Sequence, residues 1–148
     1  MKTEADMEEI SKLSFLGGLY LNKDKQVIIP SHLVEATLVC AARKTKLGKQ
    51  ATGAISIMND AVLKYDGPTD LEELFADDDH RFTNMVVVQR NRVTRTRPMF
   101  KNWEASFELQ YDEAILDEAQ IKEILVTAGN QIGFGDWRPR FGLFNVEV

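Results

Sequence analysis

The chain has 148 residues, of which 44% are hydrophobic, a length and composition typical of one globular domain with a core of ordinary size. Its formal net charge of -5 argues against a protein that coats nucleic acid indiscriminately, because that mode of binding needs a net basic surface. We therefore expect a single domain over residues 1–148, with basic character confined to local patches.

The first twelve residues hold four acids and two lysines without an apolar run, which predicts a flexible acidic leader over 1–12 and no signal peptide or membrane anchor. The single cysteine, Cys40, lies in an apolar stretch and has no second thiol to pair with, as is typical of a reducing compartment. No cluster of His and Cys residues has metal-ligand spacing. We therefore expect a cytoplasmic protein that binds no membrane, metal or cofactor.

The first half of the chain predicts two strands, a helix and an acidic insertion. Residues 13–22 have strand composition, and Ser31 is a good N-cap for a helix over 32–46 whose apolar residues recur at helical spacing. Gly48 supplies the end of that helix. A strand follows over 51–67, broken near Asn59-Asp60, and the acid-rich segment 70–79 predicts a short helix or a mobile loop.

The next segment reverses the sign of the charge. Residues 81–102 contain no acidic side chain and six basic ones, namely Arg81, Arg90, Arg92, Arg95, Arg97 and Lys101. The composition is that of a strand, but neither alternating face resembles core beyond Val88. We expect a strand that begins buried and projects into solvent as an arginine-rich arm or hairpin, with Pro98 ending its ladder.

The last third predicts a half-buried strand over 103–112, a helix that begins at Asp117 with a capping box to Gln120 and ends at Gly129, and a final strand over 141–148. The order of elements is compatible with an α+β, ferredoxin-like βαββαβ domain. Such a domain places two helices on one face of an antiparallel sheet, here with an extended arginine-rich hairpin.

Catalysis has thin support in this sequence. His32 begins the first predicted helix and is either a general base or an exposed first-turn residue, while His80 in the acidic loop is expected at the surface. No phosphate-binding loop, GxSxG, HExxH or paired CxxC motif is present.

The segment 129–146, GNQIGFGDWRPRFGLFNV, favours binding instead. Glycines let a backbone approach a phosphate and expose consecutive N–H donors, while Arg138 and Arg140 can project together as phosphate clamps. Phe134 and Trp137 can stack on bases. The alternative is structural: Gly129 caps a helix, Gly133 and Gly135 turn the chain, and Trp137 covers the edge of the core.

Two segments resemble the RAMP superfamily of CRISPR-associated proteins, which comprises guide-RNA-binding backbone subunits and repeat-processing ribonucleases. VIIPSHLVEATLVCAARK is similar to the segment that opens the family's first helix, and ILDEAQIKEILVTAGNQIGFGDWRPRFGLFNVEV is similar to its second helix, glycine-rich loop and last strand. The resemblance implies an RNA-recognition-type fold and a first-helix motif at Pro30, Ser31, His32 and Arg43. It also implies guide-RNA phosphate contacts at Gly133, Gly135, Trp137, Arg138 and Gly142.

We therefore predict a non-catalytic module that contacts the phosphates of single-stranded or guide RNA, alone, as a homo-oligomer or within a ribonucleoprotein complex of antiviral defence. The predicted RNA-binding residues are Arg43, Lys44, Lys46, Arg90, Arg92, Arg95, Arg97, Lys101, Gly133, Gly135, Trp137, Arg138 and Arg140. A second hypothesis is a viral or mobile-element protein that mimics a subunit of, or docks on, a CRISPR or other defence complex through protein contacts. A third is a metal-independent ribonuclease that uses His32.

Overall fold

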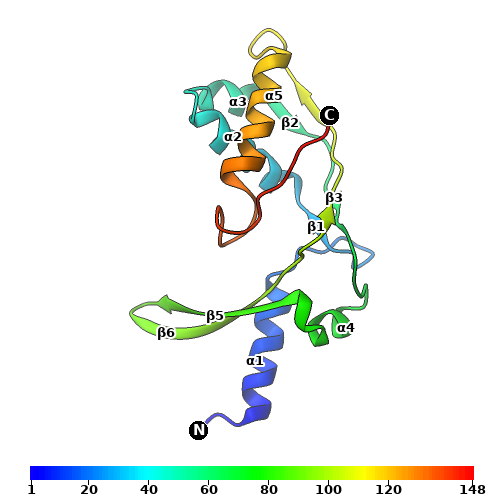
Figure 1. Ribbon diagram of the computed structural model, residues 1–148, viewed down its shortest axis with the longest axis vertical. Helices are drawn as coiled ribbons and strands as arrows, with labels where there is room; N and C mark the ends of the chain where they lie inside the picture. Colours follow the sequence, from blue (N-terminus) through cyan, green and yellow to red (C-terminus); the bar gives the residue numbers. More distant parts are fainter. The chain divides into compact units, whose positions relative to one another are not determined.

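The computed structural model describes every residue from Met1 to Val148 and shows a mixed α+β protein (Figure 1). The strands form separate two-stranded sheets, and apart from β5 and β6 they are short. The predicted α+β class is confirmed. The chain divides into two compact units: unit 1 comprises Met1–Ile28 and Val62–Ala105, and unit 2 comprises Ile29–Ala61 and Ser106–Val148. None of the helices combines the length and apolarity needed to span a bilayer.

Unit 1 begins with helix α1 (Glu4–Gly17), which Thr3 and Asp6 start together. The Asp6 N–H donates to Thr3 Oγ1 (3.1 Å) and the Thr3 N–H donates to Asp6 Oδ2 (2.9 Å), a reciprocal capping box. The helix begins in the acidic leader and continues through Phe15, which is buried with its ring centroid 5.3 Å from that of Phe75. The strand predicted over 13–22 is therefore wrong, because its first half is the end of α1.

The acid-rich segment 70–79 of unit 1, for which the sequence predicted a short helix or a mobile loop, is largely helical. It forms α4 (Leu71–Ala76), capped by the Asp70 carboxylate, and a 3₁₀ turn, η1 (Asp78–His80). Two short strands, β4 (Lys64–Tyr65) and β7 (Trp103–Glu104), pair antiparallel in the same unit.

The rest of unit 1 is a long hairpin. Strands β5 (Arg81–Val88) and β6 (Asn91–Pro98) pair antiparallel without a bulge, from Arg81 opposite Pro98 to Val88 opposite Asn91. The hairpin extends past α1 to a free tip (Figure 1). This confirms the arginine-rich hairpin predicted from the sequence.

Hydrogen bonds to Thr96, which is buried, attach the base of the hairpin to α1. The Thr96 hydroxyl lies 2.7 Å from Ser11 Oγ and 3.1 Å from Thr83 Oγ1. The Ser14 hydroxyl donates to the Thr96 carbonyl (3.1 Å). Polar side chains thus fix the base of the hairpin, while its tip has no such support.

Unit 2 contains the larger core. Helix α2 (Ser31–Arg43) packs against α3 (Gly48–Ala54), α5 (Glu118–Thr127) and the π-helical turn η2 (Ala128–Ile132). Strands β2 (Ile55–Ile57) and β8 (Leu109–Tyr111) pair antiparallel, with Ile55 opposite Tyr111. The buried side chains at the centre include Val34, Leu38, Ile57, Leu116, Ile121 and Ile124.

The helices of unit 2 match the sequence predictions better than the strands do. The capping box of Asp117 and Gln120 is present, but the chain continues past Gly129 as η2 before it turns. The strand predicted over 51–67 is split into α3, β2, β3 (Ala61–Val62) and β4, with the expected break at Asn59-Asp60. The strand predicted over 103–112 survives only at its ends, as β7 and β8. The final strand predicted over 141–148 is wrong, because this segment pairs with no other strand.

Candidate nucleic-acid interface

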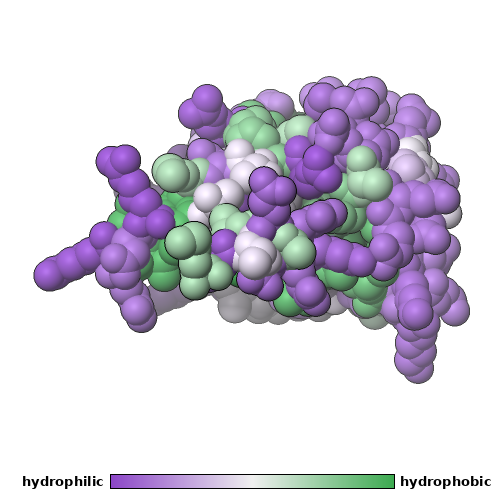
Figure 2. All heavy atoms as spheres, turned by 90° about the horizontal axis from the view of Figure 1, so that it is seen from below, coloured by the Kyte–Doolittle hydropathy of each residue, from purple (hydrophilic) through white to green (hydrophobic).

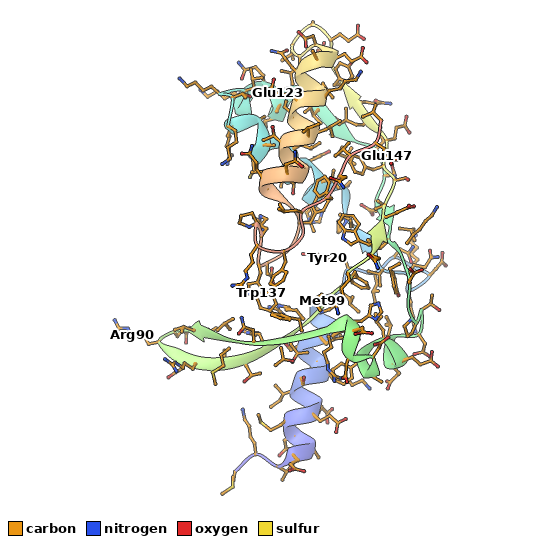
Figure 3. All side chains as sticks on the ribbon, in the orientation of Figure 1. Tyr20, Arg90, Met99, Glu123, Trp137 and Glu147 are labelled. Carbon is orange, nitrogen blue, oxygen red and sulfur yellow. The ribbon has the colours of Figure 1, made fainter.

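The tip of the β5–β6 hairpin places an arginine in an unusual conformation. Two residues, Gln89 and Arg90, join the strands, and both have positive φ (48° and 70°). Such two-residue turns favour Asn-Gly or Gly-Gly, because residues with a Cβ pay a steric cost in the left-handed region. Arg90 lies at the tip and points away from the strands (Figure 3). The chain therefore exposes a guanidinium where glycine would be more stable.

The other cations of the hairpin have different surroundings. Arg92 is exposed on the face that carries Val87, and Arg95 is half-buried on the opposite face, across from Asn84. Neither forms an ion pair with an acidic side chain of this chain. These two residues remain the best placed, with Arg90, to meet an external anion.

Two residues predicted to bind RNA have partners within unit 1. Arg97 is half-buried at the base of the hairpin, where its Nη1 points at the Ser14 carbonyl at 3.5 Å. Lys101 lies beyond the hairpin and its Nζ is 3.6 Å from Asp79 Oδ1. Arg97 and Lys101 thus contact other atoms of unit 1, which distinguishes them from Arg90 and Arg92 near the tip of the hairpin.

The glycine-rich loop of unit 2 is closed by backbone contacts that need glycine. The Phe134 N–H donates to the Gly142 carbonyl (3.0 Å), and the Phe144 N–H donates to the Gly129 carbonyl (3.0 Å). A Cβ on Gly142 would lie 1.8 Å from the Phe134 carbonyl oxygen, and one on Gly129 would lie 2.2 Å from the Phe144 oxygen. Gly129 therefore has a structural role, as the sequence left open, but through this close approach and not as the predicted helix cap, because it lies inside η2. Gly142 has a structural role as well.

Aromatic stacking and one hydrogen bond complete the closure of this loop. The rings of Phe134 and Phe144 stack with centroids 4.6 Å apart, so Phe134 is engaged inside unit 2. Gly133 is buried with φ 75°, and its carbonyl accepts a hydrogen bond from the hydroxyl of Thr37 on α2 (3.4 Å). These contacts fix the two ends of the loop, between which residues 135–141 project.

The projecting part of the loop is where a ligand has access. Gly135 has φ 101° and no other atom within 4 Å of its would-be Cβ. Trp137 lies on this part of the loop (Figure 3), half-buried. Arg138 donates from Nη1 to the Gly135 carbonyl (2.9 Å), and Arg140 lies over the Phe141 ring at 5.8 Å. Both arginines are exposed but are held by loop atoms, which directs their remaining donors outward.

A third basic cluster lies where α2 meets α3. Arg43, Lys46 and Lys49 line a hollow of about 420 Å³ together with Gly48, Gln50 and Thr52. Arg43 crosses over Gly48, where a Cβ would lie 2.7 Å from its Cγ. Lys46, with φ 62°, takes the left-handed position after α2, so Gly48 begins α3 rather than ending α2 as predicted. Lys44 is exposed but does not line the hollow.

The structure therefore groups the predicted residues into three clusters. The hairpin belongs to unit 1, whereas the glycine-rich loop and the α2–α3 hollow belong to unit 2. Sequence reasoning missed Lys49, Gln50 and Thr52, because the segment was assigned to a turn and a strand. The signal available for Lys49 was its place three residues after Lys46 in a basic run.

The two histidines differ in burial. His32 is exposed at the start of α2. His80 is buried, which corrects the prediction of a surface residue: its Nδ1 lies 3.1 Å from Asp77 Oδ2, and its ring meets those of Tyr65 and Phe100. The Asp79 N–H, which donates to the Asp77 carboxylate, is the main cause that lowers the pKa of Asp77. His80 and Asp77 thus stabilise unit 1.

Comparison of the chain with models of protein families, with curated proteins and with solved structures gave no match. The groups described at the three clusters are mainly cations, with the half-buried ring of Trp137 on the loop. This set binds anions and stacks on flat rings.

Proposed function

We propose that this chain is a non-catalytic RNA-binding protein akin to the RAMP superfamily, which holds single-stranded RNA mainly by its phosphates. Arg90 and Arg92 of the hairpin supply contacts from unit 1, and the loop over 135–140 supplies contacts from unit 2. Arg43, Lys46 and Lys49 extend the basic surface of unit 2. Because these contacts are made to phosphates and base faces, they give affinity with little sequence selectivity.

One observation carries the proposal: the exposed Arg90 occupies a left-handed turn position that favours glycine or asparagine and disfavours long side chains such as arginine. A backbone outlier of this kind is a reason to look for a function of the side chain, since stability alone would favour glycine or asparagine. The charge distribution supports the same conclusion. The chain is acidic overall, yet residues 82–102, which span most of the hairpin, contain no acid.

The order of elements in unit 2 supports a ferredoxin-like fold, the fold that accompanies this function in the RAMP superfamily. Strand β1 (Ile28–Ile29) leads into α2 and β2, and β8 leads into α5 and the extended segment 142–148. With α3 left aside, β1, α2, β2, β8 and α5 follow the first five elements of a βαββαβ domain, with most of unit 1 inserted between β2 and β8. The segment 142–148 would take the place of the last strand. We include this fold in the proposal.

The test is a fluorescence-anisotropy titration of labelled single-stranded RNA at several salt concentrations. We expect binding that weakens with salt, and a loss of affinity in the Arg92→Ala and Arg140→Ala variants, which report on the two units separately. Lys122→Ala is the matched control, because Lys122 is an exposed cation of α5 whose Nζ pairs with Glu118 at 3.0 Å. Affinity that is equal in all four proteins would overturn the proposal.

Two further outcomes would point to the other hypotheses. Absence of RNA binding at low salt would favour docking on a protein complex, in which the exposed acids of α1 and α4 imitate nucleic acid. Cleavage of the RNA that persists in chelator and disappears in His32→Ala would show a ribonuclease.

A further inference from the structure

The outer edge of β5 is unpaired and, from Phe82 to Val88, uncharged. In the structure β5 pairs only with β6, so its other edge has no strand beside it. From Phe82 to Val88 the strand has no charged residue, and it has no proline or bulge. Proteins normally protect such an edge by charges, prolines, bulges or a covering segment.

The outer edge of β6 is protected in these ways. It carries Arg92, Arg95 and Arg97 and ends at Pro98. At its base, the Thr96 carbonyl accepts the hydroxyl hydrogen of Ser14 on α1. The two edges of one hairpin therefore differ, and only the β5 edge is open to another strand.

The exposed side chains of β5 are apolar. Met85 is 62% exposed and Val87 is 69% exposed, and both lie on the face that carries Thr83. In the space-filling view, hydrophobic side chains lie beside the long hydrophilic ones of the hairpin (Figure 2). A monomer leaves this apolar surface in water, whereas pairing with another strand would cover part of it.

We propose that two copies of this chain associate through their β5 strands, which pair antiparallel about a two-fold axis at Met85 and form a four-stranded sheet. A second copy is the occupant that the charges favour, because β5 brings no like charges together, whereas pairing through β6 would bring arginines together. The arginines of both β6 strands then lie on the two outer edges.

The backbone geometry selects this register. In a hairpin with a two-residue turn, Val88 and Asn91 share hydrogen bonds, so the N–H and C=O groups of Thr83, Met85 and Val87 point to the free edge. In a pair centred on Met85, the two Met85 residues lie opposite each other, and Thr83 of each copy lies opposite Val87 of the other. The outward N–H and C=O groups of these three residues then all form hydrogen bonds between the two copies. The Met85 N–H, which now donates to Asn84 Oδ1 (2.8 Å), exchanges that bond for one across the interface.

Sedimentation velocity of the full chain over a range of concentrations tests this proposal without RNA, so it stands or falls independently of the proposed function. We expect a species of twice the chain mass that grows with concentration. Met85→Lys should be monomeric, because two lysines would meet at the axis. The control Thr94→Lys adds the same charge on the same face, directly opposite Met85 but on β6, and should still dimerise.

A charge swap tests the register. Met85→Lys and Met85→Glu, each monomeric alone, should form a mixed dimer when combined, because the two positions face each other only about this axis. Wild type that stays monomeric at the highest concentration, or Met85→Lys that still dimerises, would overturn the proposal. A mixed sample that stays monomeric would overturn the register. Circular dichroism of each variant shows whether it is folded.

Discussion

Replacing the arginine at the hairpin tip by glycine should make the protein more stable and a weaker RNA binder at once. Arg90 has φ 70°, in the left-handed region where a Cβ meets the backbone carbonyl. Arg90→Gly removes that contact and leaves the turn and the strand register in place. It also removes a guanidinium that, on the proposed function, contacts phosphate.

The expected magnitudes follow from the conformation. Relief of the left-handed position is worth about 1 to 2 kcal/mol, and the greater freedom of glycine in the unfolded chain costs about 0.4 to 1 kcal/mol. The midpoints of these two ranges leave a net gain of about 0.8 kcal/mol, or about 2 to 3 °C in Tm for a chain of this size. Loss of one phosphate contact should lower the salt dependence of single-strand binding by about 0.7 in the slope of log K against log salt.

The neighbouring turn residue supplies a matched control. Gln89 has φ 48° and no charge, so Gln89→Gly should raise Tm in the same way and leave RNA binding unchanged. Thermal unfolding followed by circular dichroism and anisotropy titration at several salt concentrations measure both effects. If Arg90→Gly binds RNA as tightly as Gln89→Gly, the tip arginine has no role in binding. If neither variant is stabilised, the argument from the left-handed turn fails.

Three further predictions concern stability, each measured by thermal unfolding. Gly142→Ala should destabilise the protein by more than about 2 kcal/mol, because its Cβ would force the closed loop apart at a residue with positive φ. The control Gly53→Ala lies in a helix with open space around it and should stabilise the protein slightly. Equal effects of the two substitutions would show that the loop is not closed in this way. Asp77→Asn should lower Tm at pH 7, because a carboxyl with a lowered pKa stabilises the folded state while it is ionised. This deficit should begin to shrink near pH 4, about the ordinary pKa of an aspartate, and should vanish only below the lowered pKa of Asp77; a deficit that is constant with pH would contradict this. Thr96→Val should cost about 1 to 2 kcal/mol by breaking its hydrogen bonds to Ser11 and Thr83, and less in a Ser11→Ala background, where only the bond to Thr83 is left to lose.

Local signals predicted the helices and the hairpin. The capping box at Asp117 begins a real helix, because capping depends only on residues within one turn. The helix predicted from Ser31 is also present, but Ser31 is its first residue, and the N-cap is Pro30 without a side-chain cap. The hairpin followed from a run of strand-forming residues without acids. The same kind of signal was overlooked at Thr3 and Asp6, so the end of α1 was assigned to a strand on its aromatic and aliphatic content alone.

The remaining features depend on contacts between distant segments. His80 is buried because Gly67 leaves room for its ring, with a would-be Cβ only 2.5 Å from it, and no local pattern encodes that approach. The predicted strands over 51–67 and 103–112 are broken because they pair only in two short stretches, Ile55–Ile57 with Leu109–Tyr111 and Lys64–Tyr65 with Trp103–Glu104. For the candidate site, the sequence named the cations, but the left-handed turn at Arg90 and the hollow at α2–α3 required the structure.

The way in which the chain leaves and re-enters unit 2 makes the hairpin exchangeable. Just after β2, the Asn59 side chain accepts a hydrogen bond from the Glu108 N–H (2.7 Å) and donates to the Ser106 carbonyl (3.3 Å). One amide thus ties the two ends of the inserted segment together at the boundary of unit 2. Insertions whose ends meet in this way tolerate changes of length and content, because closing a longer loop between joined ends costs little additional entropy. Evolution can therefore lengthen, recharge or replace the arm on this protein while the helices of unit 2 keep their sequence.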